Sequence, residues 1–128
     1  MDGTNYAIKM KDNSYSPYSN FRVGACLEFL DGTLIGGCNI ENASYGLTIC
    51  AERVAVSNAI AQGKDLQSAT TLYIATDSQT FTPPCGACLQ VLVEFFTDLK
   101  VVLINSNGTK QFTLNELLPH NFSKDNLN

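Results

Sequence analysis

The sequence predicts a three-layer α/β fold in which helices cover both faces of one mixed, five-stranded sheet. Two observations support this fold class. Strand-like apolar segments alternate with segments of helical periodicity in the second half of the chain. Two hairpin turn signals, Asp31-Gly32 and Asn107-Gly108, join strand pairs that must be antiparallel, which makes the sheet mixed. With 128 residues, the chain has the length of one domain, and we expect 1–128 to form a single unit.

Strands and helices are expected in a definite order along the chain. Apolar or β-branched runs bounded by turn residues predict strands at 21–30, 33–40, 69–76, 101–104 and 110–113. Apolar residues at helical spacing predict helices at 4–11, 49–62, 85–96 and 115–118. In the first helix, Tyr6 and Met10 are four positions apart and share a face. Gly36 and Gly37 interrupt the second strand, which indicates that a ligand or another backbone approaches closely there.

The second and third helices are predicted to start beside cysteines. Thr48 is expected to cap the second helix, and Pro84 is expected to open the third, because proline is tolerated in the first helical turn. Cys50, Cys85 and Cys88 then lie near the two helix starts. Aligned peptide dipoles place partial positive charge at a helix N-terminus, which favours ionised thiols.

Composition excludes several classes of function. The formal net charge is -4, and no two Lys or Arg residues are adjacent, so a nucleic-acid partner is not expected. No apolar run approaches the length of about 20 residues that a membrane span needs, and the first residues lack a signal-peptide pattern. We therefore expect a cytoplasmic protein without membrane partners. In that compartment, an odd count of 5 cysteines indicates metal binding or catalysis before disulfides.

Two short motifs carry the chemistry: Cys-x-Glu at 50–52 and Pro-Cys-x-x-Cys at 84–88. Three thiolates would bind zinc and leave one coordination position open, and Glu52 beside them can move protons. Three thiolates on a zinc dication leave a charge of about -1, and Arg53 is the candidate compensating cation. A sealed structural zinc site would need a fourth protein ligand, and the only histidine, His120, lies in a loop-like tail.

Other readings of the cysteines remain open at this point. A Cys-x-x-Cys motif alone is equally typical of a redox dithiol. Cys26 and Cys38 lie in predicted strands, where a small buried thiol is the usual explanation.

Taken together, these motifs resemble those of the small, three-cysteine cytidine deaminases. The similarity runs from residue 15 to residue 122 and is carried by 21–25, 37–47, 50–53, 84–88 and 116–119. It implies that the chain is one catalytic domain with one Zn²⁺. The implied reaction is hydrolytic deamination of cytidine and deoxycytidine to uridine and deoxyuridine plus ammonia, in pyrimidine salvage.

The resemblance also assigns the reacting groups. The implied zinc ligands are Cys50, Cys85 and Cys88. Glu52 would take a proton from water, deliver it to N3 of the pyrimidine and later protonate the departing amine. The chain departs from the family at Leu89, where many relatives have Arg, so Arg53 alone would offset the thiolate charge.

Substrate-binding roles follow from the same resemblance. Phe21 would stack on the pyrimidine, and a backbone carbonyl near Cys50 or Ala51 would hold its amino group. Asn39 and Glu41 are two apart on an extended segment, so their side chains point the same way, toward the ribose hydroxyl groups. On the residues alone, Phe21 is also compatible with core packing. On the residues alone, Asn39 and Glu41 are more typical of a polar loop than of a binding site.

The family is usually homotetrameric, and neighbouring subunits complete its sites. Tyr45 and Phe122 match the positions that reach the substrate from those neighbours. Packing in a core or an interface is the alternative for both residues.

Three alternative functions remain on sequence grounds. A deaminase for another aminopyrimidine nucleoside would keep the same motifs. A non-catalytic zinc or dithiol module would have no need of Glu52. Nucleic-acid editing is disfavoured by the acidic balance and by the lack of a basic, aromatic-lined groove.

Overall fold

The computed structural model describes residues 1–127, and five strands over this range form one sheet in the order β2-β1-β3-β4-β5. The strands are β1 (Val23–Phe29), β2 (Leu34–Cys38), β3 (Ala69–Thr76), β4 (Lys100–Asn105) and β5 (Gly108–Thr113). β3 and β4 run parallel, and every other neighbouring pair is antiparallel. The mixed five-stranded sheet is therefore confirmed, and both predicted hairpins close at their glycines.

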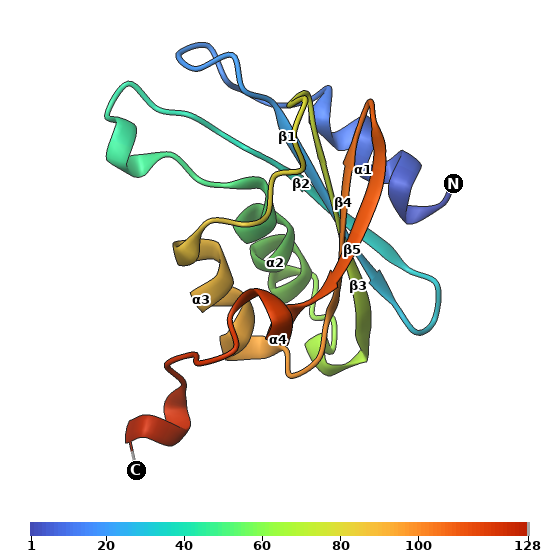
Figure 1. Ribbon diagram of the computed structural model, residues 1–128, viewed down its shortest axis with the longest axis vertical. Helices are drawn as coiled ribbons and strands as arrows, with labels where there is room; N and C mark the ends of the chain where they lie inside the picture. Colours follow the sequence, from blue (N-terminus) through green and yellow to red (C-terminus); the bar gives the residue numbers. More distant parts are fainter. Residues whose placement is uncertain (128) are drawn as a thin grey trace.

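Helices cover both faces of this sheet, as the sequence predicts (Figure 1). The helices are α1 (Gly3–Lys11), α2 (Ala51–Ala61), α3 (Gly86–Phe95) and the single turn α4 (Leu114–Leu117). Short 3₁₀ turns occur at Tyr45–Leu47, Leu66–Ser68 and Lys124–Leu127. α1 packs on one face, while α2 and α3 pack side by side on the other (Figure 1). No helix in the described range is long and apolar enough to cross a membrane.

Successive side chains of a strand point to opposite faces of the sheet, so the core has two parts. On the side of α2 and α3, Leu27, Leu72 and Leu103 belong to the main buried cluster. On the side of α1, Cys26 and Ala75 belong to a smaller cluster. Residues 101–104 of β4 also alternate between the two clusters, so both faces of this strand are apolar, which explains its continuous apolar run.

The paired glycines of β2 allow a helix to seat closely on each face. A Cβ atom built on Gly37 would lie 2.5 Å from the backbone nitrogen of Ala55 in α2. A Cβ atom on Gly36 would lie 2.5 Å from Cε1 of Tyr6 and 2.6 Å from Sδ of Met10. The close approach predicted from the sequence is confirmed, and so is the shared face of the two α1 side chains.

The start of α2 differs from the prediction. The N-cap residue is Cys50, whose side chain makes no capping hydrogen bond. Ile49 exchanges two backbone hydrogen bonds of 2.9 Å with Ile40, so the chain just before the helix is held extended. The prediction that Thr48 caps the helix is therefore wrong, and its buried hydroxyl has no partner within residues 1–127. Cys85 likewise is the N-cap of α3, so Pro84 precedes the helix instead of opening it.

Candidate metal centre and cavity

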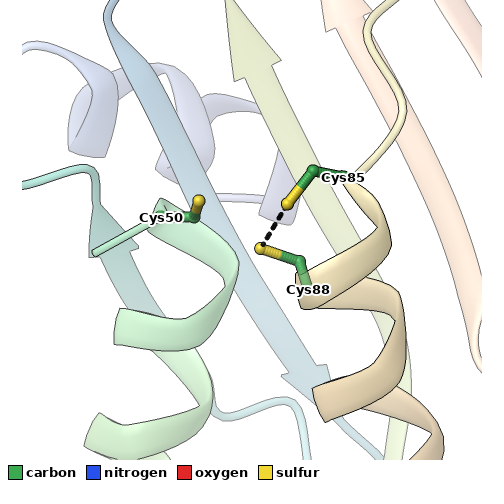
Figure 2. A group of neighbouring side chains, drawn as sticks. All are labelled: Cys50, Cys85 and Cys88. Carbon is green, nitrogen blue, oxygen red and sulfur yellow. Dashed lines mark hydrogen bonds between the residues drawn. The ribbon is translucent and has the colours of Figure 1, made fainter. Parts of the chain in front are cut away.

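Three cysteines meet where α2 and α3 begin. Cys50 and Cys85 are the N-cap residues of the two helices, and Cys88 lies in the first turn of α3. Their sulfur atoms all lie within 4.8 Å of one another, and the Cys85 thiol donates to Sγ of Cys88 at 3.6 Å (Figure 2). The two helix starts thus bring together residues that are 35 positions apart or more.

The donor set fits zinc. Sulfur atoms about 2.3 Å from a tetrahedral zinc ion lie about 3.8 Å from one another, close to the spacing of this cluster. Three thiol donors are soft ligands that suit zinc and do not suit magnesium or calcium. In the described part of the chain, no histidine or carboxylate joins the three sulfurs as a further ligand of the cluster. The cluster therefore leaves a fourth position for water or substrate.

Charge is distributed unequally over the thiols. The pKa of Cys50 is lowered to about 5, chiefly because the Cys88 thiol donates a hydrogen bond to it and also because Arg53 is close. Nη2 of Arg53 donates to Sγ of Cys50 at 3.5 Å, and its buried Nε–H has no partner within residues 1–127. The same hydrogen bond, together with burial, raises the pKa of Cys88. Leu89 joins the main core, so Arg53 is the guanidinium group at the thiols.

Glu52 lies beside the cluster in the first turn of α2, with only 5% of its surface exposed. Burial raises the pKa of its carboxyl group, and the negative charge of Cys50 acts in the same direction. A hydrogen bond with Cys88 and the charge of Arg53 partly oppose this shift. A carboxyl group with a raised pKa can accept and release a proton near neutral pH, which suits a general acid and base.

A cavity of about 270 Å³ opens in front of Glu52 and the cysteines. It brings together most of the side chains singled out in the sequence, namely Phe21, Asn39, Glu41, Tyr45, Cys50, Ala51, Glu52 and Cys85. Cys88 and Arg53 do not line it, and neither does Phe122, which is 58% exposed and whose carbonyl accepts from Nε2 of Gln90 at 2.8 Å. Phe122 is thus the predicted substrate contact that the chain alone does not bring to the cavity.

Asn39 fixes the edge of the cavity next to β1. Its Oδ1 accepts from the backbone N–H of Val23 at 2.9 Å and from the Ser14 hydroxyl, and its Nδ2 donates to the carbonyl of Phe21 at 2.7 Å. Phe21 is 38% exposed at the cavity, so it does not belong to the buried core. Tyr45 is 58% exposed at the rim of the same cavity.

Several residues that line the cavity have no predicted role in a functional site. Ser19, Thr48, Thr76 and Thr82 all line the cavity. Ser19 belongs to the segment 13–20, whose Ser- and Asn-rich composition is typical of a loop and does not show which hydroxyl group faces inward. These residues reach the cavity through contacts between segments that are far apart in the sequence, and a local sequence pattern does not show such contacts.

The two remaining cysteines differ from each other. Cys26 is fully buried, and burial raises the pKa of its thiol to about 12, as expected for an inert core residue. Cys38 is only partly buried, so the expectation of a buried thiol is wrong there. It is the last residue of β2, which is an edge strand of the sheet.

Comparison with known proteins agrees with this site. Residues 2–104 match the family described as the cytidine and deoxycytidylate deaminase zinc-binding region. The cytidine deaminase of Halalkalibacterium halodurans is 44% identical over 124 residues, which cover 95% of this chain and 92% of the relative. The cytidine deaminase of Sporosarcina psychrophila is 43% identical over 121 residues, covering 93% and 88% of the two chains.

A solved structure shows the same fold. The crystal structure of cytidine deaminase from Burkholderia pseudomallei aligns with a TM-score of 0.90 and 39% identity, and the alignment covers 94% of this chain and 96% of that one. The match extends over nearly the whole of both chains. The chain therefore belongs to the zinc-binding cytidine and deoxycytidylate deaminase family.

Proposed function

We propose that this protein catalyses the hydrolytic deamination of cytidine and deoxycytidine to uridine and deoxyuridine, with release of ammonia, in pyrimidine salvage. One observation carries the proposal. The buried carboxyl group of Glu52 lies beside three thiols that fit one zinc ion, at a cavity that is also lined by an exposed aromatic ring and two polar side chains. The relatives compared above are named cytidine deaminases, which supports the choice of substrate.

In this proposal, Cys50, Cys85 and Cys88 would hold one zinc ion, which would supply a Lewis acid for the activation of a water molecule. Glu52 accepts a proton from that water and delivers it to N3 of the pyrimidine, while the water oxygen adds to C4. Glu52 then transfers the second proton of the water to the amino nitrogen. The C4–N bond breaks, ammonia leaves, and the oxygen remains as the carbonyl of the uridine product.

The other side chains of the cavity orient the substrate. Phe21 would stack against the pyrimidine ring, and Asn39 and Glu41 would bind the sugar hydroxyl groups. Ala51 begins α2 and lines the cavity, and its backbone carbonyl would hold the amino group of the base. Arg53 would offset the charge of the thiolates, as its contact with Cys50 suggests.

We further propose that the protein acts as a homotetramer in the cytoplasm. Tyr45 and Phe122 are both exposed in the single chain, as side chains that reach a neighbouring subunit would be. All five cysteines are free, which fits a reducing compartment. The formal net charge of -4 gives no support to a nucleic-acid substrate.

The test is the ultraviolet spectrum of cytidine during incubation with the zinc-loaded protein. We expect conversion to the spectrum of uridine, and we expect it to be lost after treatment with a chelator. Glu52→Gln should lower kcat by at least about 10²-fold while zinc content stays unchanged. Glu94→Gln, which removes an exposed carboxylate from α3, is the matched control and should keep full activity.

The outcomes separate the alternatives. No conversion of cytidine by a protein with one bound zinc per chain would favour another aminopyrimidine nucleoside. Full activity in Glu52→Gln would rule out the assigned role of Glu52. Absence of bound zinc together with absence of activity would favour a dithiol module.

A further inference from the structure

The carboxylate of Glu41 is held by the turn that precedes Phe21. Its Oε1 accepts from the backbone N–H groups of Tyr18, at 2.9 Å, and Ser19, at 3.2 Å. Its Oε2 accepts from the hydroxyl group of Ser19. An ionised carboxylate has about four acceptor positions; these bonds fill three of them, and the hydroxyl group of Tyr45 is a weaker donor to the same carboxylate.

The Glu41 side chain is buried as well as hydrogen-bonded, so its carboxylate is held in one orientation. Glu41 is 4% exposed although it lines the cavity, and Ser19 lines the same cavity. The hydrogen bond from Ser19 is the largest cause that lowers the pKa of Glu41, so the side chain is held as a carboxylate. A buried carboxylate that has lost one of its donors would be free to rotate or to take up a proton.

Ser19 also connects Glu41 to the segment that carries the aromatic ring. While its hydroxyl donates to Glu41, its oxygen accepts from the backbone N–H of Phe21 at 3.0 Å. Between them, Asn20 adopts a left-handed conformation with φ of 59° and donates to the Ser16 carbonyl at 3.0 Å, which closes the turn. One hydroxyl therefore joins the two sides of the cavity that face the base and the sugar.

We propose that Ser19 is a positioning residue that aligns Glu41 with the sugar hydroxyl groups of the nucleoside. This inference rests on the proposed function, in which Glu41 binds those hydroxyl groups. Ser19 is not needed for the chemistry at Glu52. Its loss should therefore weaken binding of the sugar and should change the chemical step much less.

The experiment compares two substrates in steady-state kinetics. Cytidine carries the secondary sugar hydroxyl groups, and 2′,3′-dideoxycytidine lacks them. For Ser19→Ala we expect kcat/KM on cytidine to fall by about tenfold, mainly through KM. On 2′,3′-dideoxycytidine, the same variant should stay within about twofold of wild type, because the contact that Ser19 supports is already absent.

Three further variants separate positioning from a structural effect. Ser19→Thr keeps the hydroxyl and should restore most of the loss on cytidine. Ser106→Ala removes an exposed hydroxyl in the turn between β4 and β5, which makes no hydrogen bond within residues 1–127, and should match wild type on both substrates. In a Glu41→Gln background, Ser19→Ala should cost nothing further on cytidine, since Ser19 acts through Glu41.

Several results would overturn the inference. An equal loss on both substrates would show that Ser19 only supports the loop, and a full additional loss in the Glu41→Gln background would show direct contact with substrate. An unchanged KM in Ser19→Ala would also reject it. If wild type fails to deaminate cytidine, the proposed function fails, and this assignment fails with it. If wild type deaminates cytidine but the Ser19 variants do not behave as expected, only the role of Ser19 is wrong.

Discussion

The carboxyl group of Glu52 lies at the start of α2 with 5% of its surface exposed, next to a thiol whose pKa is lowered to about 5. Burying an ionised carboxylate costs free energy, and a neighbouring thiolate adds to that cost. In the proposed mechanism, this buried carboxyl group is the proton carrier. Ionised Glu52 therefore lowers the stability of the folded state, while the proposed reaction needs the same carboxyl group at this buried position.

This conflict predicts a pH-dependent stability difference in the zinc-free protein. The pKa of Glu52 in the folded state lies above its ordinary value of 4.5, so the folded state binds this proton more tightly than the unfolded state. The stability that it contributes is complete below that ordinary value and is lost as pH rises through the raised pKa. Replacement by Gln removes this loss. In chelator-treated protein, Glu52→Gln should therefore melt above wild type at about pH 8 and close to it at about pH 4.

Thermal unfolding followed by circular dichroism checks this prediction. Glu94→Gln is the control, since that side chain is exposed. The melting temperature of this variant should stay close to that of wild type. If the stability of Glu52→Gln relative to wild type did not increase from about pH 4 to about pH 8, the assignment of Glu52 as a buried, destabilised carboxylate would be contradicted.

At the scale of elements, Gly37 determines how closely α2 approaches the sheet. A Cβ atom there would lie 2.5 Å from the backbone nitrogen of Ala55 and 2.8 Å from the carbonyl oxygen of Ala51. Backbone atoms in the middle of a helix cannot move aside individually, so the whole helix would have to shift. Because α2 carries Cys50 and Glu52 at its start, such a shift would displace the metal centre as well.

Gly37→Ala is therefore expected to lower the free energy of unfolding by about 1–3 kcal/mol, the usual cost of overpacking. Zinc retention in the presence of a chelator should fall in the same variant. Gly86→Ala is the control, because a Cβ atom on Gly86 would meet nothing within 4 Å although it lies between two of the cysteines. Urea unfolding and metal analysis of both variants check the prediction. Equal stability of the two would mean that α2 can shift without cost.

The elements also show what the sequence can and cannot predict. Residues that signal locally gave correct predictions: the apolar runs of the strands, the glycines of both hairpins, and the pair Gly36 and Gly37. The start of α2 was predicted wrongly, because the pairing of Ile49 with Ile40 depends on a strand-like contact that no local pattern shows.

The site follows the same division. The thiols and Glu52 stand in short motifs whose spacing can be read directly. Glu41 is held by the backbone N–H groups of Tyr18 and Ser19 as well as by the Ser19 hydroxyl group, and backbone donors have no signature in a sequence.

For the molecule as a whole, the main feature outside the cavity is apolar surface on the segment before α2. We call Ile40, Tyr45, Leu47 and Ile49 the 40–49 patch; they are 41%, 58%, 66% and 41% exposed. Scattered exposed apolar residues are ordinary, but these lie on one segment and Tyr45 also lines the cavity. A subunit seated on this patch would cover apolar surface and border the substrate at the same time.

The patch therefore provides a test of the proposed homotetramer. Wild type should elute with a mass near four times the 13.9 kDa of one chain when light scattering is measured during size-exclusion chromatography. Leu47→Glu places a charge in the middle of the patch, so it should shift the protein to smaller assemblies and lower its activity on cytidine. Leu30→Glu is the matched control: Leu30 is 77% exposed at the turn between β1 and β2, and its replacement should leave the mass unchanged. A monomeric wild type with full activity would contradict both the tetramer and the completion of the site by neighbours, whereas a tetramer that tolerates Leu47→Glu would place the subunit interface elsewhere on the surface.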